Sequence, residues 1–174
     1  MNAIRVLFAG VVLVSGVSLA ANTVYKNTKY GFALTYPSTW ENVKAVKGSI
    51  VAWFREAKPV GGFATSVNVT VTPLKGVQYL RESDLDPFGD AILKVVSADI
   101  PEFKLIKRSH TTLGGQPTFA YTFTGKASGM ELQGYNLSTI YKSKGYTLYF
   151  TAPKKTYAQY EKTFNVIKNS FKLL

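Results

Sequence analysis

Stretches in which apolar and polar residues alternate recur along this chain, and they restrict it to a fold built mainly of β-strands. In residues 65–73 valine occupies every second position between asparagine and threonine, and the same period of two continues in residues 118–124, 135–141 and 146–152. Successive side chains of a strand point to opposite faces of a sheet, so each stretch predicts a half-buried strand. Glycine-containing turns separate the stretches, which predicts antiparallel neighbours. Weaker strand patterns occupy residues 33–36, 49–55 and 103–112.

Two segments change to the spacing of three and four residues that is typical of amphipathic helices. The first follows Asp86 and Pro87, where Asp86 is predicted to cap the helix and Pro87 to take its first position. The second follows Thr156 and Gln159, which fit a capping box. The apolar stripes consist of Phe88, Ala91, Ile92, Val95 and Val96, and of Tyr157, Tyr160, Phe164, Ile167 and Phe171. Both stripes are predicted to dock on the sheet, which gives an α+β fold with a central antiparallel β-sheet flanked by helices.

The first twenty residues resemble a secretory signal peptide. Arg5 precedes an apolar run from residue 6 to residue 14, and small residues lead to a predicted cleavage site after Ala20. The alternative is a retained membrane anchor, but Ser15 and Gly16 shorten the run below the roughly 20 apolar residues that a span needs. We therefore expect residues 1–20 to be removed and residues 21–174 to form a single domain without a stable membrane span. This domain is expected to be exported, to a periplasm or out of the cell.

Few residues of the chain suit catalysis or metal binding. It has no cysteine, and His110 is its only histidine, so we expect no disulfide, no zinc or copper site, no cofactor and no catalytic residue. An acidic cluster between Glu82 and Asp90 has a spacing similar to that of a calcium loop. The spacing fails for an EF-hand, however, because a proline or an apolar residue occupies a required ligand position in either register. Helix capping is the preferred interpretation, and a weak cation site there is left open.

The chain is strongly basic and its positive charge is concentrated toward the C-terminus. The formal net charge is +11, with 21 Lys and Arg against 10 Asp and Glu. Such a surface favours an anionic partner, either a protein or a component of the cell envelope, although lysines also serve simply to keep a surface soluble. We expect Lys162, Lys168 and Lys172 to be exposed on the last helix, away from its apolar stripe. The complete predicted partner-binding set is Lys142, Lys144, Lys154, Lys155, Lys162, Lys168 and Lys172.

Three segments together resemble the PsbP-like superfamily, which includes Mog1-like and DcrB-like proteins. Residues 30–40 (YGFALTYPSTW) resemble its opening strand and turn, and residues 114–121 (GGQPTFAY) resemble its glycine-rich turn into a long strand. Residues 145–152 (GYTLYFTA), followed by the stripe of the second helix, resemble its final strand and helix. The resemblance implies an antiparallel sheet with helices on both faces, and a binding or assembly role without enzymatic activity.

The expected function is therefore an exported, non-enzymatic accessory protein that acts as a monomer through its basic surface on an anionic partner. We do not expect nucleic acid as that partner, because no nucleic-acid-binding motif accompanies the positive charge. Two alternatives remain open. The first is a secreted hydrolase that uses a pair of carboxylates, which needs no histidine. The second is a carrier with an aromatic-lined pocket for a small ligand between sheet and helix.

Overall fold

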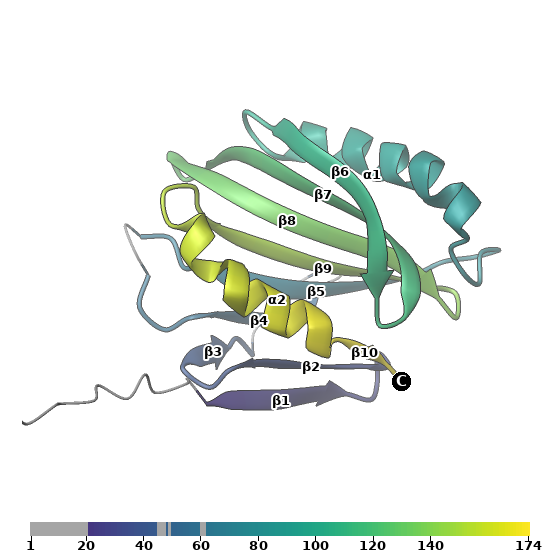
Figure 1. The fold of residues 1–174 in the computed structure, drawn as a ribbon, viewed down its shortest axis with the longest axis horizontal. Helices are drawn as coiled ribbons and strands as arrows, with labels where there is room; N and C mark the ends of the chain where they lie inside the picture. The colour runs from purple at the N-terminus through teal and green to yellow at the C-terminus, as the bar shows by residue number, and fades with distance from the viewer. Residues whose placement is uncertain (1–20, 45–47, 49, 60–61) are drawn as a thin grey trace, which may run out of the picture.

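Two antiparallel sheets and two helices form the structure, a computed structural model that describes residues 21–44, 48, 50–59 and 62–174 (Figure 1). The large sheet has the strand order β3-β4-β5-β9-β8-β7-β6 and the small sheet the order β1-β2-β10. The large sheet consists of β3 (Trp40–Asn42), β4 (Ile50–Glu56), β5 (Ser66–Pro73), β6 (Lys104–Leu113), β7 (Gln116–Ala127), β8 (Met130–Tyr141) and β9 (Lys144–Pro153). The small sheet consists of β1 (Asn22–Asn27), β2 (Phe32–Pro37) and β10 (Lys172–Leu173).

The large sheet is covered on both faces. Helix α1 (Leu85–Asp99), preceded by the short 3-10 helix η1 (Glu82–Asp84), packs on one face against β7, whereas α2 (Glu161–Ser170) and the small sheet cover the other (Figure 1). A second 3-10 helix, η2 (Tyr157–Tyr160), leads into α2. The predicted α+β fold, an antiparallel sheet flanked by helices, is therefore confirmed. The separate small sheet, with β1 and β10 at its edges, was not predicted.

The core beneath α2 joins the two sheets. Phe164 and Ile167 of the predicted stripe are 3% and 0% exposed, and they share one cluster with Phe32 of β2 and Phe150 of β9. Trp40, at the start of β3, also belongs to this cluster. Full burial of each such side chain contributes roughly 1.5–3 kcal/mol to stability. The last helix is therefore part of the main core.

Helix α1 approaches β7 closely because it carries a glycine at the contact. A Cβ on Gly89 would lie 2.3 Å from Cε2 of Phe119, which is fully buried beneath the helix. Any larger residue at position 89 would therefore force α1 or the Phe119 ring to move. Leu85 and Phe119 belong to the second core, and Phe88, Ile92 and Val96 of the predicted stripe pack against it. The other two members of the stripe, Ala91 and Val95, are exposed, contrary to the prediction. This core lies under the β6–β7 side of the sheet.

Neither predicted cap forms its side-chain hydrogen bond, although Thr156 does occupy the N-cap position of η2. The N-cap residue of α1 is Asp84, which makes no side-chain cap, and Asp86 instead lies in the first turn and binds side chains of β6. Thr156 donates from Oγ1 to the carbonyl of Pro153, 3.3 Å away, and makes no side-chain cap either. Asp86 is bound by Arg108 and His110 of β6, whereas Thr156 bonds a carbonyl only three residues before it in the chain, so both side chains have partners other than the helix amides.

The predicted signal peptide, residues 1–20, lies outside the described residues. Among the residues that are described, no helix is long and apolar enough to cross a membrane.

Candidate functional site

Four segments that are distant in the sequence meet at one end of the molecule. The hydroxyl of Tyr146 on β9 donates a 2.8 Å hydrogen bond to the carbonyl of Tyr30, in the β1–β2 turn. The amide of Leu174 bonds the carbonyl of Gly31 at 2.9 Å. The amide of Leu74, just after β5, bonds the carbonyl of Ser143 in the β8–β9 turn at 2.8 Å. These bonds hold the β1–β2 turn, the β8–β9 turn, the segment after β5 and the C-terminal strand together.

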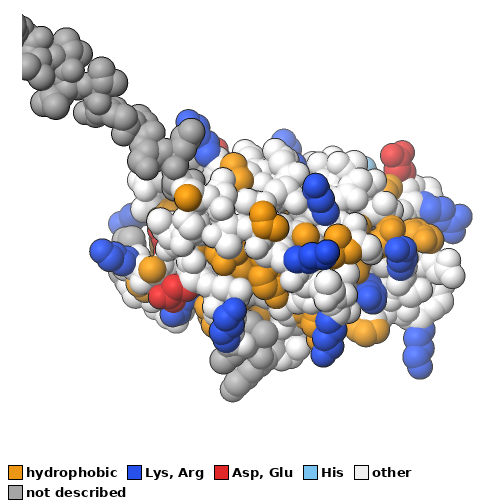
Figure 2. Space-filling model, turned by 90° about the horizontal axis from the view of Figure 1, so that it is seen from below, with side chains coloured by type: hydrophobic (Ala, Val, Ile, Leu, Met, Phe, Trp, Pro, Cys, Tyr) orange, Lys and Arg blue, Asp and Glu red, His pale blue; other side chains and the backbone are white. Residues whose placement is uncertain are grey.

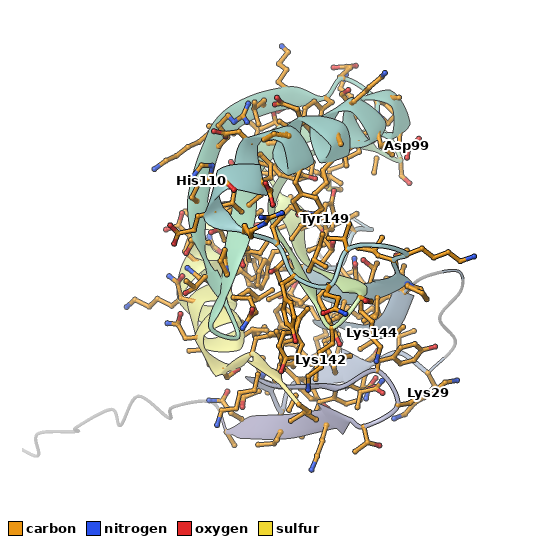
Figure 3. All side chains as sticks on the ribbon, turned by 90° about the vertical axis from the view of Figure 1, so that its right-hand side faces the viewer. Lys29, Asp99, His110, Lys142, Lys144 and Tyr149 are labelled. Carbon is orange, nitrogen blue, oxygen red and sulfur yellow. The ribbon has the colours of Figure 1, made fainter. Side chains whose placement is uncertain are left out.

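Each of these four segments carries lysine. Lys29 precedes Tyr30, Lys75 follows Leu74, and Lys142 and Lys144 flank Ser143. On the small sheet, Lys26 and Lys172 both pair with Ala33 of β2 and therefore lie on one face, to either side of it. Figure 3 shows Lys29, Lys142 and Lys144 together at this end, far from His110 and Asp99. We call this set the basic end: Lys26, Lys29, Lys75, Lys142, Lys144 and Lys172.

The charge of the basic end is not balanced by neighbouring acids. Residues 26–31, 74–79, 141–146 and 172–174 contain no Asp or Glu. Within the described chain, none of the six lysines forms an ion pair, whereas the ion pairs that exist involve side chains elsewhere. Seen from the side of the small sheet, the surface carries many basic and few acidic side chains (Figure 2). Unpaired positive charge of this kind produces a local potential that attracts anions.

The tip of the β8–β9 turn adopts a conformation that side chains other than glycine rarely take. Lys142 and Ser143 have φ of 49° and 57°, both in the left-handed region. Each such residue costs roughly 1–2 kcal/mol relative to an ordinary conformation. Backbone hydrogen bonds hold the turn from outside: the amide of Leu74 donates to the carbonyl of Ser143, and the amide of Ser143 donates to the carbonyl of Gln78. Lys142 extends over its neighbour Tyr141, with Nζ 4.8 Å from the ring centroid, so its ammonium group stays at the surface.

The structure does not bring all seven predicted lysines together. Lys142, Lys144 and Lys172 belong to the basic end. The set Lys154, Lys155 and Lys162 follows the far end of β9, which ten strand residues place about 30 Å from Lys144. Lys154 lies there 3.5 Å from Oε2 of Glu131. The β9 strand therefore separates the predicted lysines into two groups.

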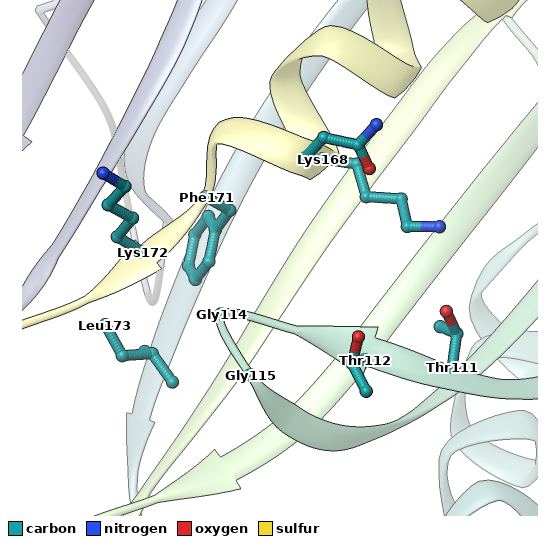
Figure 4. A pocket seen from close by; sticks show the side chains of 9 residues that line it. Thr111, Thr112, Gly114, Gly115, Lys168, Phe171, Lys172 and Leu173 are labelled. Atoms are coloured by element: carbon teal, nitrogen blue, oxygen red, sulfur yellow. The ribbon is translucent and has the colours of Figure 1, made fainter.

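Lys168 differs from its two predicted companions on the last helix. Lys162 is exposed as expected, and Lys172 is exposed but lies on β10 and not on the helix as predicted. Lys168 is half-buried, contrary to the prediction. It lines a cavity of about 490 Å³ between the end of α2 and the β6–β7 turn at Gly114 and Gly115. Figure 4 shows its side chain directed toward Thr111, whereas the Lys172 side chain extends away from the cavity. Packing of the helix end against the β6–β7 turn covers part of the Lys168 side chain.

Sequence reasoning missed Lys26, Lys29 and Lys75. They lie in the N-terminal half, whereas the prediction followed the charge excess toward the C-terminus. The only local signal was the position of Lys29 and Lys75 next to Tyr30-Gly31 and Gly76, which marks turns. No local pattern shows which turns share an end of the sheet.

The acidic cluster before and within α1 is occupied by basic side chains. Arg108 binds Asp90 at 2.9 Å and Asp86 at 3.0 Å, and Nε2 of His110 lies 3.1 Å from Oδ1 of Asp86. The hydrogen bond with His110, assisted by Arg108, holds the pKa of the Asp86 carboxyl below its usual value. Nowhere in the described part of the chain do three or more His, Asp or Glu side chains gather as they would around a metal ion. The cluster thus joins α1 to β6.

The hydrolase alternative requires a carboxylate pair, and the acids that line four cavities of the described chain do not supply one. Four cavities of about 490, 340, 260 and 240 Å³ are lined entirely by described residues. The first has no carboxylate in its lining, and each of the others has one: Asp99, Glu56 and Glu161, respectively. A two-carboxylate mechanism needs both acids on one substrate. None of these four cavities provides that arrangement.

Comparison with solved structures shows the same fold in proteins of low sequence identity. CyanoP, the PsbP of the cyanobacterium Synechocystis sp. PCC 6803, matches with a TM-score of 0.68 and 19% identity, over 91% of this chain and 96% of that one. LpqN of Mycobacterium tuberculosis, involved in cell envelope biogenesis, matches with a TM-score of 0.65 and 13% identity, over 91% of this chain and 87% of that one. A Pseudomonas aeruginosa protein of unknown function matches with a TM-score of 0.56 and 15% identity, over 83% of this chain and 91% of that one.

A comparison with curated protein sequences finds no match. The family model named PsbP, in contrast, matches residues 20–173, which include every strand and helix described above. This chain therefore belongs to the PsbP family.

Proposed function

We propose that this protein is an exported, non-enzymatic binding or assembly accessory that docks on an anionic partner through the basic end. One observation carries the proposal: six lysines from four segments meet at one end of the molecule. Those segments contain no Asp or Glu, and none of the six lysines forms an ion pair with a described residue. Membership of the PsbP family supports a binding role, and the signal-like first twenty residues support export. The partner we propose is an anionic protein face or an anionic component of the cell envelope, and the protein acts as a monomer.

The arrangement of the basic end suits docking better than it suits catalysis. Lys26, Lys29 and Lys172 are exposed on the small sheet, and Lys142 is exposed at a turn that neighbouring backbone holds in place. Because the backbone that carries these lysines is already ordered, docking does not have to order it, although each lysine side chain that is immobilised still costs about 0.5–1.5 kcal/mol. Long-range attraction by such a surface speeds association and weakens as salt rises. The similarity to LpqN is compatible with a partner in the envelope.

The proposal is tested by charge reversal at the two ends of the molecule. In one variant Lys29, Lys142 and Lys172 are changed to Glu; in the matched control Lys154, Lys155 and Lys162 are changed to Glu. Both variants alter the net charge equally and all six side chains are exposed, so neither should unfold the protein. The tagged proteins are used to capture partners from the native envelope at increasing salt, because screening shortens to about 10 Å at 0.1 M.

We expect the first variant to lose the captured partner and the control to keep it, with wild-type capture falling steeply between low and high salt. Equal loss in both variants would show that only total charge matters. Equal retention in both would show that these lysines serve solubility alone. Either of these two results contradicts a specific role for the basic end.

A further inference from the structure

A second feature, on the opposite face of the large sheet, is independent of the basic end. Helix α1 lies over the β6–β7 side of this face, and a cavity of about 340 Å³ opens between its C-terminal end and strands β4, β5 and β9. Trp53, Phe63, Ile100 and Phe123 contribute apolar walls. Tyr149, which also lines the cavity, lies on the α1 side of the sheet in Figure 3. A mostly apolar hollow of this volume is typical of a site for a small molecule.

The floor of the cavity belongs to one row of polar and aromatic side chains that crosses the sheet. Tyr121 pairs with Asn136, Asn136 with Tyr149, Tyr149 with Asn68, and Asn68 with Trp53, so all five point to the same face. The two buried side-chain polar atoms without a hydrogen-bond partner in the described structure are Trp53 Nε1 and Tyr121 Oη, at the two ends of this row. Such atoms are rare in native proteins, and each calls for an explanation. The row therefore has unused hydrogen-bonding capacity.

Asn68 and Tyr149 lie between the two ends of this row, and both line the cavity. Both are half-buried, and within the described residues neither side chain makes a hydrogen bond, whereas neighbouring Ser66 and Thr151 bond each other at 3.2 Å between their hydroxyl oxygens. Burial raises the pKa of the Tyr149 hydroxyl above its ordinary value of 10, so the hydroxyl is neutral and can donate. Ligand pockets usually orient their ligand through a few polar groups placed among apolar and aromatic walls, and Asn68 and Tyr149 fit this pattern.

The charges around the cavity favour a neutral ligand. Asp99 and Lys126 also belong to its lining and have opposite signs. The Lys126 ammonium already binds Oε1 of Glu102 at 2.6 Å. An anionic ligand buried among the apolar walls would therefore lose its hydration without gaining a free cation. Asp99 is exposed to solvent, so pairing with it would return little of the hydration that a cationic ligand loses.

From these observations we propose that the cavity binds a neutral small aromatic molecule whose carbonyl-type oxygen accepts a hydrogen bond from Tyr149, with Asn68 beside it. The aromatic part packs against Trp53, Phe63 and Phe123, where stacking adds to the burial of apolar surface. The site lies on the face of the sheet opposite to the small sheet that carries Lys26 and Lys172. Binding in the cavity and docking at the basic end can therefore be tested separately.

The test compares two probes of nearly equal size, 2-acetylnaphthalene, which has a carbonyl, and 2-ethylnaphthalene, which has none. Equilibrium dialysis measures their binding to the purified protein and to Tyr149→Phe, which removes only the hydroxyl. Tyr135→Phe is the matched control, because Tyr135 is also half-buried but packs on the other face of the sheet, against the α2 core. Ala127→Phe provides a second variant, since Ala127 lines the cavity at the end of β7 and a larger side chain there fills it.

We expect saturable binding of both probes to the wild-type protein. Tyr149→Phe should weaken the acetyl probe about fivefold, as expected for the loss of one hydrogen bond, and change the ethyl probe less than twofold. Tyr135→Phe should change neither probe, and Ala127→Phe should weaken both at least tenfold. The proposal is overturned if neither probe binds saturably with a dissociation constant below 1 mM, which corresponds to a binding free energy of about −4 kcal/mol. It is also overturned if Tyr149→Phe weakens both probes equally, or if Ala127→Phe weakens neither.

Discussion

The hydroxyl of Tyr146 donates a 2.8 Å hydrogen bond to the carbonyl of Tyr30, and this contact ties the large sheet to the β1–β2 turn of the small one. Tyr146 is 2% exposed, and its ring lies in the core beneath α2. The bond places Lys29, next to Tyr30, at the same end as Lys144, two residues before Tyr146. The position of the basic end therefore depends on a contact between residues 116 positions apart in the chain.

The first prediction concerns this bond. Tyr146→Phe keeps the ring in the core but leaves the Tyr30 carbonyl without its side-chain donor. We expect the free energy of unfolding to fall by about 1 kcal/mol, measured by urea denaturation. Tyr141→Phe is the control, because the Tyr141 hydroxyl has no hydrogen bond among the described residues, and it should change stability by less than about 0.5 kcal/mol. Equal effects of the two substitutions would show that the bond contributes nothing specific.

The second prediction concerns the close approach of α1 to β7. Alanine is favoured over glycine in a helix by about 1 kcal/mol, but a Cβ at position 89 would lie 2.3 Å from the Phe119 ring. Overpacking of a core costs typically 1–3 kcal/mol, so Gly89→Ala is expected to destabilise the protein overall. Gly145→Ala is the control, because a Cβ at position 145 would lie 3.4 Å from its nearest neighbouring atom and would not clash. A more stable Gly89→Ala variant in thermal unfolding would show that α1 can shift freely.

The third prediction concerns α2. Ile167 is fully buried, and Ile167→Ala should reduce the free energy of unfolding by about 2–5 kcal/mol through lost burial and the cavity that remains. Its neighbour Val166 is 43% exposed, so Val166→Ala is expected to have an effect below about 0.5 kcal/mol. The two variants are compared by urea denaturation. Similar values would mean that α2 is peripheral to the core, contrary to the packing described here.

The fourth prediction concerns pH. The hydrogen bond with His110, together with Arg108, lowers the pKa of Asp86 in the folded protein. A lowered folded pKa means that this contribution to stability is complete above the unfolded value of about 3.9 and is lost as the pH falls through the folded value. In a carboxyl-carbon NMR titration, Asp86 should therefore titrate below its usual pH.

The His110→Asn variant separates the effect of the imidazole from that of Arg108. It should move the Asp86 titration back toward higher pH. Thr112→Asn, an exposed substitution two positions further along β6, should leave it unchanged. An unshifted Asp86 titration in the wild-type protein would contradict the pairing of α1 with β6.

Much of the fold was predictable because its pattern is local. The valines of β5 and the aromatic residues of β7 and β9 alternate with polar residues, as predicted. The stripe predicted for the last helix packs into the core, although Tyr157 lies in η2 and Phe171 follows the end of α2. The edge strands β1 and β10 escaped prediction because they are short and largely exposed, so burial leaves no pattern in them. The side-chain caps predicted at Asp86 and Thr156 do not form, because partners outside the helices bind these side chains.

By itself the sequence determined the strand and helix content, the antiparallel arrangement, the excess of positive charge and the scarcity of catalytic residue types. These properties follow from composition and from side-chain periodicity, which do not depend on distant contacts. Only the tertiary structure decided which lysines share an end, because hydrogen bonds between neighbours of these lysines, Tyr146 with Tyr30 and Leu74 with Ser143, join segments that are distant in the chain. Likewise, the row from Tyr121 to Trp53 depends on the register of five strands. Register is set by the packing of a whole face at once, so no single segment reveals it.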